Sequence, residues 1–241
     1  MTELLYLPDD DGTTTFTATV TEATDEYIVL DRTYFYPEGG GQPPDHGTLS
    51  WDGGEAEITD ARKNHGDVRH YVESLRGDLP DEGTTVEGDV DADRREQLCR
   101  MHTAQHVVSR VVLDEYGATT AGNQIHPDRS RIDFEPVSFD DEDIERIQRL
   151  SNEAIDADYA VTKANRPRET VEDEVDEGRA LLDLIPDFVD PLRVVEIEAF
   201  DMCPCGGTHV DSLAEIGSID IIDRSSKGAD IERIEFQLTP E

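Results

Sequence analysis

The chain reads DRREQLCRMHTAQHVVSRVVLDEY from residue 93 to residue 116, and this stretch carries the plainest helix pattern in the sequence. Its apolar residues recur at the spacing of one helix face: Leu98, Met101, Val108, Val111 and Val112. Asp91 or Asp93 can cap the helix, and Gly117 can end it. Residues four apart share a helix face, so the imidazoles of His102 and His106 can reach one metal ion.

A second pair of metal-ligand types lies in the stretch C-G-G-T-H at 205–209. Gly206 and Gly207 let the backbone fold so that Cys205 and His209 approach one another. Thiolate and neutral imidazole are ligands that zinc prefers, and two such pairs complete a tetrahedral shell. Each pair alone is more often coincidence than metal site, but the whole chain holds only seven histidines and three cysteines. The sequence therefore predicts one zinc ion per chain, held by His102, His106, Cys205 and His209.

The N-terminal part of the chain consists of short strand patterns separated by turn residues. Residues 13–20 alternate, with Phe16, Ala18 and Val20 on one face and threonines on the other. Further strands are expected at Tyr27–Leu30, Gly47–Trp51, Ala56–Thr59, Val68–Val72 and Thr85–Val90. Their short, even spacing predicts a small β-barrel or sandwich over residues 1–91.

The remainder, residues 92–241, mixes helices and strands. Beside the histidine-bearing helix we expect a helix over Asp140–Ala157 and a broken helix over Val171–Asp183. Strands are expected at Ser130–Phe134, Ala160–Ala164, Leu192–Phe200, Gly217–Asp223 and Ile231–Leu238, the last two joined by a hairpin-like connection at Ser225–Gly228. The predicted fold is α+β: a small N-terminal β-barrel packed on a mixed α/β zinc-containing domain.

The net charge of −36, from 57 acidic and 21 basic residues, is spread along the whole chain. Strand and helix patterns recur throughout, which argues against a disordered acidic protein. We interpret the excess as adaptation to a very salty cytoplasm, as in a halophilic archaeon, because dispersed carboxylates keep a surface hydrated. No apolar run is long enough to span a bilayer, and the start of the chain lacks the features of a signal peptide. Three cysteines cannot pair completely, so a reducing, cytoplasmic location is expected.

A glycine-rich stretch, Y-F-Y-P-E-G-G-G-Q-P-P-D-H-G at 34–47, is the sharpest motif besides the ligand pairs. The N–H groups of Gly39, Gly40 and Gly41, next to Gln42, can approach a phosphate or sugar closely, although an ordinary turn between strands also fits. Together with H-T-A-Q-H, C-G-G-T-H and a closing R-I-E-F at 233–236, this loop resembles the editing domain of alanyl-tRNA synthetase. Without the synthetase core, the chain is similar to the free-standing alanyl-tRNA editing proteins of medium length.

The resemblance implies hydrolysis of the ester that joins a wrong amino acid, serine or additionally glycine, to tRNA(Ala). It implies the four metal ligands named above, and it places Thr120 where the family contacts the substrate, with Asn123 close by. A pocket made for alanine rejects serine poorly, so a second site must recognise the added hydroxyl by hydrogen bonding. Thr103 and Gln105, inside H-T-A-Q-H, are candidates for ordering the attacking water or the substrate, although for Gln105 an ordinary helix position fits equally well.

Four protein ligands describe a closed zinc site, whereas catalytic zinc keeps one position for water. Either the ion holds the shape of the site while other groups activate water, which we favour, or one ligand is held loosely and the ion takes part. A non-catalytic, zinc-stabilised tRNA-binding module is therefore an alternative, as is editing of Ser-tRNA(Thr). H-T-A-Q-H lacks the glutamate of a zinc peptidase, which makes that activity a poor hypothesis.

The expected partner is the acceptor end of tRNA(Ala), bound by a monomer or weak dimer. Phosphate binding at this net charge requires a local neutral or basic patch at the metal cleft. Its candidate cations are Arg94, Arg95, Arg100, Arg129, Arg131, Arg224, Lys227 and Arg233.

Overall fold

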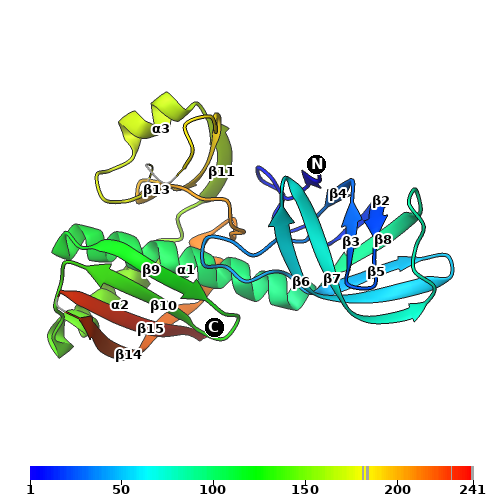
Figure 1. Ribbon diagram of the computed structural model, residues 1–241. Coiled ribbons are helices and arrows are strands. Elements are labelled where there is room, and N and C mark those ends of the chain that lie inside the picture. Colours follow the sequence, from blue (N-terminus) through cyan, green and yellow to red (C-terminus); the bar gives the residue numbers. More distant parts are fainter. Residues whose placement is uncertain (181, 183–184, 229, 240–241) are drawn as a thin grey trace. The chain divides into compact units, whose positions relative to one another are not determined.

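The structure is a computed structural model, and it describes residues 1–180, 182, 185–228 and 230–239. The chain divides into two compact units, Met1–Gln97 and Leu98–Glu241 (Figure 1). The boundary falls inside helix α1 (Ala92–Tyr116). In the ranges that the structure describes, no helix has the length and apolar character needed to cross a membrane.

The first unit contains a closed β-barrel, as the alternating patterns predict. Its strands follow the order β2-β3-β7-β6-β5-β8 around the barrel. They are β2 (Thr15–Ala23), β3 (Tyr27–Leu30), β5 (Gly47–Trp51), β6 (Gly54–Asn64), β7 (Asp67–Gly77) and β8 (Thr85–Val90), while β1 (Glu3–Leu4) and β4 (Arg32–Thr33) pair separately. In β8 every second residue is buried, which places Val86 and Val90 in the barrel core.

A buried ion pair ties the start of α1 to the loop before β5. The guanidinium of Arg95 donates to both carboxylate oxygens of Asp45, and also to the backbone oxygens of Asp11 and Tyr34. Arg95 and Asp45 are both almost fully buried. The prediction that Arg95 belongs to a tRNA-binding patch is therefore wrong, because its charge is already matched inside the barrel unit.

The second unit holds α1 against a four-stranded antiparallel sheet of order β14-β15-β10-β9 (Figure 1). The strands are β9 (Thr119–Ile125), β10 (Ser130–Glu135), β14 (Ser218–Gly228) and β15 (Ile231–Thr239). One apolar core joins Met101 and Val108 of α1 with Ile132 of β10 and Phe236 of β15. Cys99 lies in this core, as expected of a packed thiol.

Helix α2 (Asp141–Asp156) packs on β14 and confirms the predicted second helix. Asp140 caps it in a capping box with Asp143, so two backbone donors at the helix start are satisfied. Ile147, Ala154 and Ile155 are buried, as the helical spacing indicates.

A smaller antiparallel sheet of order β11-β12-β13 carries the second ligand pair on its last strand and the loop that follows. Its strands are β11 (Val161–Arg166), β12 (Leu192–Ile197) and β13 (Asp201–Pro204), and a 3-10 turn, η2 (Leu213–Ile216), comes after the loop. The predicted strand Leu192–Phe200 is shorter, since the chain turns at Ala199, whose φ of 53° lies in the left-handed region. Cys203 consequently sits within a strand of its own.

Three other expectations differ from the structure. Strand β9 was not predicted, because T-T-A-G-N-Q-I shows little apolar alternation. The helix expected over Val171–Asp183 is α3 (Arg168–Glu174): Pro167 precedes it and Val175 is already extended, while Asp183 lies outside the described residues. The stretch Ser225–Gly228 belongs to β14 rather than to a turn, because β15 pairs with β14 as far as Gly228.

Candidate metal centre

Helix α1 presents the first ligand pair. His102 and His106 are both buried, and their ring centroids lie 5.3 Å apart, as expected for residues one turn apart on a helix. The ring of His209 approaches both, with centroid separations of 4.3 Å to His102 and 4.8 Å to His106. Three imidazoles from two distant segments therefore meet at one point.

The loop after β13 brings the second pair. Arg193 of β12 donates from its guanidinium to the backbone oxygens of Cys205 and Gly207, each at 2.8 Å, and its own carbonyl accepts from the Cys205 N–H at 3.1 Å. The Gly207 N–H lies 3.4 Å from the Cys205 sulfur. These contacts hold the loop so that the thiol faces α1.

The four expected ligands converge. One donor atom from each of His102, His106, Cys205 and His209 lies within 4.8 Å of the others, so the cluster can hold a metal ion. The Cys205 sulfur is 3.5 Å from His102 Nε2 and 3.3 Å from His209 Nε2. Zinc–sulfur and zinc–nitrogen bonds of ordinary length, at a tetrahedral angle, place these two ligand atoms about 3.6 Å apart. The spacing fits a tetrahedral ion.

The electrostatics of the cluster favour a thiolate. Burial raises the pKa of Cys205, but the neighbouring His102 and His209 outweigh burial and hold this pKa well below its usual range. Burial and the adjacent His102 hold the pKa of His209 well below its usual range. A deprotonated thiol and neutral imidazoles are the protonation states that metal binding requires.

Asp201 and Arg179 lie directly behind His106. Arg179 binds the Asp201 carboxylate through two hydrogen bonds, from Nε at 2.6 Å and from Nη2 at 2.5 Å. The Asp201 Oδ2 atom is 3.7 Å from His106 Nδ1. Burial alone would lower the pKa of His106, but the carboxylate of Asp201 and the Cys205 thiol raise it. Burial would raise the pKa of Asp201, but Arg179 holds it well below its usual range.

Neither of these two residues was foreseen from the sequence. A local pattern does point to Asp201: Asp201, Cys203 and Cys205 alternate along one strand direction, so their side chains share a face. Cys203 is buried and stays outside the ligand cluster, and burial raises the pKa of its thiol to about 12. Its sulfur lies 4.0 Å from the backbone oxygen of Arg179.

Thr103 has a different place from the one expected. Its hydroxyl donates to the backbone oxygen of Cys99 at 2.9 Å and accepts from the Val210 N–H at 3.3 Å. The same oxygen lies 3.1 Å from His209 Nδ1. Because the hydroxyl proton is used on Cys99, the ring N–H of His209 donates to Thr103, which leaves His209 Nε2 for the cluster. Thr103 is fully buried and orients a ligand, so ordering of water by its hydroxyl is not supported.

The other predicted polar residues form two hydrogen-bonded pairs between α1 and β9. Asn123 Nδ2 donates to Gln105 Oε1 at 2.9 Å, and the Thr120 hydroxyl donates to Ser109 at 3.1 Å. A β-bulge at Ala121 makes this possible: Asn123 lies opposite Ile132, and Thr120 lies opposite Phe134. Residues opposite one another share a face, so Thr120 and Asn123 both face the core side although they are three apart. The sequence did not reveal Ser109.

The glycine-rich loop belongs to the barrel unit and forms a tight turn. Gly39 and Gln42 exchange backbone hydrogen bonds of 3.1 and 2.9 Å, and Gly40 and Gly41 between them have φ of 59° and 85°. Such φ values at both central positions require glycine in practice. The backbone amides of Gly39 and Gln42 are therefore used within the turn, and Gly40 is its exposed tip.

Several of the candidate cations are matched by groups of their own unit. Arg233 binds Asp133 through two hydrogen bonds of 2.6 and 2.8 Å, and Arg100 donates to the backbone oxygen of Ile216. Arg224 donates to the backbone oxygen of Phe139 and lies 3.6 Å from Glu232. Arg129 and Lys227 are exposed. The local basic patch stays a prediction that rests on fewer cations than expected.

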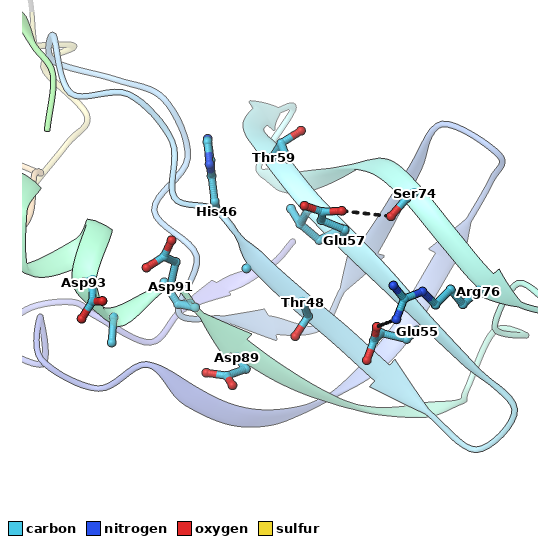
Figure 2. Close-up of a pocket in the computed structure, with 14 residues that line it drawn as sticks. His46, Thr48, Glu55, Glu57, Thr59, Ser74, Arg76, Asp89, Asp91 and Asp93 are labelled. Carbon is cyan, nitrogen blue, oxygen red and sulfur yellow. Dashed lines mark hydrogen bonds and ion pairs between the residues drawn. The ribbon is translucent and has the colours of Figure 1, made fainter.

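One pocket of about 690 Å³ lies on the barrel unit (Figure 2). Glu55 pairs with Arg76 and Glu57 accepts from Ser74 along its wall. Its other charged lining residues are Asp89, Asp91 and Asp93, and His46 completes that end. This predominantly acidic lining repels phosphate, and none of the four clustered ligands contributes to it.

Comparison with known proteins identifies the class of both halves. The family model described as tRNA synthetases class II (A) matches residues 5–94, and the one described as threonyl and alanyl tRNA synthetase second additional domain matches residues 192–235. The second match covers the C-G-G-T-H loop and most of the following hairpin. The chain thus carries the editing-type unit of the threonyl and alanyl tRNA synthetases.

Individual relatives define the family more closely. The chain is 38% identical over 243 residues to the alanyl-tRNA editing protein AlaX-M of Methanosarcina barkeri, and 37% identical over 244 residues to that of Methanosarcina acetivorans, with 99% of each chain covered in both cases. It is also 42% identical over 219 residues to the alanine–tRNA ligase of Methanopyrus kandleri, of which it spans 23% of the length. This chain belongs to the family of alanyl-tRNA editing proteins AlaX-M.

Proposed function

We propose that this chain is a hydrolase that removes serine, and additionally glycine, from wrongly charged tRNA(Ala). The buried cluster of three imidazoles and one thiol carries the proposal, because it lies in a chain that aligns with AlaX-M editing proteins over 99% of its length. The second additional domain of the threonyl and alanyl tRNA synthetases matches the segment that supplies two of these four ligands. The substrate acts in translation, so we place the protein in the cytoplasm.

We infer further that the metal is a single zinc ion. The donor set of one thiolate and three imidazoles suits zinc, and the sulfur–nitrogen separations of 3.5 and 3.3 Å suit its tetrahedral shell. When bound, zinc supplies a fixed positive charge that either organises the site or acts as a Lewis acid. Four protein ligands favour the organising role. The tasks of binding and orientation then fall to the surrounding side chains.

In the proposed reaction, water attacks the carbonyl carbon of the aminoacyl ester. The carbon–oxygen bond to the terminal ribose breaks, and the ribose hydroxyl leaves with a proton that originates from the water. Gln105 is our candidate for ordering the water or the substrate, with its carboxamide held by Asn123. Thr103 contributes indirectly, because its hydroxyl fixes His209.

Recognition of serine is assigned to Thr120. Its hydroxyl proton is directed to Ser109, which leaves the Thr120 oxygen to accept a hydrogen bond from the serine hydroxyl of the substrate. An alanyl group offers no such donor, so a site of this kind discriminates against it. Asn123 lies on the same face of β9 and completes the proposed substrate-binding wall.

The proposed contact with the nucleic acid includes the glycine turn. Gly40 and Gly41 form its tip, flanked by Gly39 and Gln42, and glycine lets a ribose or phosphate approach the backbone closely. A chain with a net charge of −36 has to form such contacts at high salt, where repulsion is screened. We expect binding of the tRNA(Ala) acceptor end by a monomer or weak dimer.

The decisive experiment measures deacylation of Ser-, Gly- and Ala-tRNA(Ala), and of Ser-tRNA(Thr), at high potassium chloride with and without a chelator. We expect rapid release of serine, slower release of glycine, little release of alanine, and loss of all activity on metal removal. Bound but intact Ser-tRNA(Ala) would instead identify a non-catalytic tRNA-binding module. Preferential cleavage of Ser-tRNA(Thr) would assign the chain to the threonine system.

A further inference from the structure

A buried ion pair with no part in the proposed chemistry stands directly behind one metal ligand. Arg179, from the segment after α3, grips the Asp201 carboxylate through two nearly parallel hydrogen bonds of 2.6 and 2.5 Å. Both side chains are buried, and the Asp201 side chain is fully enclosed. The Cys203 sulfur, on the same face of β13, also contacts the backbone oxygen of Arg179. Strand β13 therefore holds Arg179 from two positions.

The carboxylate of this pair faces the nitrogen of His106 that points away from the ligand cluster. His106 Nδ1 is buried and has no hydrogen-bond partner among the described residues, and Asp201 Oδ2 lies 3.7 Å from it. A buried N–H beside a carboxylate is stabilised, whereas a buried lone pair there would be repelled. The arrangement therefore selects the tautomer with its proton on Nδ1, which leaves the Nε2 lone pair toward the cluster.

We propose that Asp201, held by Arg179, is a positioning residue that fixes the tautomer and ring orientation of His106 for metal binding. The inference rests on the proposed function only in so far as the cluster binds zinc. It also gives a role to the segment after α3, which delivers Arg179 to the metal centre, and to Cys203, which supports that segment without binding metal. A carboxylate behind a metal-bound histidine raises the basicity of the ligand as well as orienting it.

A purely structural ion pair is the competing explanation. Buried pairs are often no more stabilising than apolar residues of similar volume, so stability alone gives little reason to bury these charges. The two explanations differ in what they predict for metal binding. If the pair only joins the segment after α3 to β13, its loss weakens the fold and leaves the intrinsic affinity of the four ligands unchanged.

The test compares Asp201→Asn with a matched control, Asp133→Asn. The control breaks another two-hydrogen-bond arginine–aspartate pair, Arg233–Asp133, which touches none of the ligands. Zinc affinity of the full-length protein is measured by competition with a chromophoric chelator. We expect Asp201→Asn to weaken zinc binding by about 10- to 100-fold, the usual effect of losing such an outer partner, and the control to change it by less than about threefold. Equal affinities of wild type and Asp201→Asn would overturn the proposal.

Two further measurements guard against a variant that folds poorly. In the wild-type protein loaded with zinc, histidine nitrogen–proton correlation spectra should show His106 protonated at Nδ1, and the opposite tautomer would overturn the proposal without any substitution. In the cobalt-loaded protein, Asp201→Asn should shift the visible absorption bands, whereas Asp133→Asn should not. Failure of the two proposals is distinguishable: wild-type protein that binds zinc but leaves Ser-tRNA(Ala) intact contradicts only the function, and unchanged zinc affinity in Asp201→Asn contradicts only the positioning role.

Discussion

His70 makes the stability of the barrel depend on pH. It lies on β7 with no exposed surface, its Nδ1–H donates to the Ile28 backbone oxygen at 3.0 Å, and its Nε2 accepts from the Thr33 hydroxyl at 2.8 Å. The ring packs edge-on against Phe35 at 5.3 Å. Burial lowers the pKa of His70 from 6.5 to about 4, although the Ile28 carbonyl opposes this. The barrel thus holds a neutral imidazole.

The direction of the effect follows from proton binding. Between the folded-state pKa of about 4 and the unfolded-state value of 6.5, the unfolded chain binds more protons than the folded chain. The contribution of His70 is therefore complete above the unfolded value and is lost as the pH falls toward the folded one. A difference of about 2.5 pKa units corresponds to about 3.4 kcal/mol in total, of which about 2 kcal/mol is lost by about pH 5.

The measurement uses Trp51, the only tryptophan, whose fluorescence reports on the barrel during urea unfolding. The numerous carboxylates titrate in every variant, so the relevant quantity is the difference in unfolding free energy between wild type and His70→Gln. This difference should shrink by about 2 kcal/mol between about pH 7.5 and about pH 5. His65→Asn is the control, because His65 is exposed at a φ of 50° that asparagine tolerates. A wild-type advantage that does not change with pH, or a His70 pKa near its ordinary value in a direct NMR titration, would refute the reasoning.

Other substitutions test the metal centre, the specificity wall and the barrel. Cys205→Ala should abolish both zinc binding and deacylation, whereas Cys203→Ala should retain both; the reverse pattern in metal analysis and tRNA assays would mean that the wrong thiol is assigned. Ser109→Ala removes the hydroxyl that directs its threonine partner, so the rate on Ser-tRNA(Ala) should fall about 10-fold at unchanged zinc content; an unchanged preference for serine over alanine would contradict the assigned role. Asp45→Asn leaves a buried arginine without its counter-charge and should cost about 3–5 kcal/mol in urea unfolding; a loss well under 1 kcal/mol would show that the arginine finds another solution.

The elements that could be predicted are those whose pattern is local. In β8 the alternation T-V-E-G-D-V appears directly as alternating burial, because one face of the strand lines the barrel. Helix α2 could be predicted from its acidic start and its apolar spacing together. Strand β9 lacks such a pattern: its place depends on pairing with β10, and polar residues are tolerated on its core side because α1 supplies partners for them.

The candidate site divides in the same way. The ligands could be found from the sequence because metal chemistry restricts both residue type and spacing, so histidine and cysteine pairs stand out in any chain. The groups that orient them carry no such restriction. Thr103, Asp201 and Arg179 are ordinary residue types whose role exists only through contacts with side chains remote in sequence, such as His106 with Asp201 and Thr103 with His209. The β-bulge at Ala121 acts similarly, since it alone brings Thr120 onto the face of Asn123. A ligand set is therefore legible in a single sequence, while the geometry that selects its tautomers and its substrate requires the folded chain.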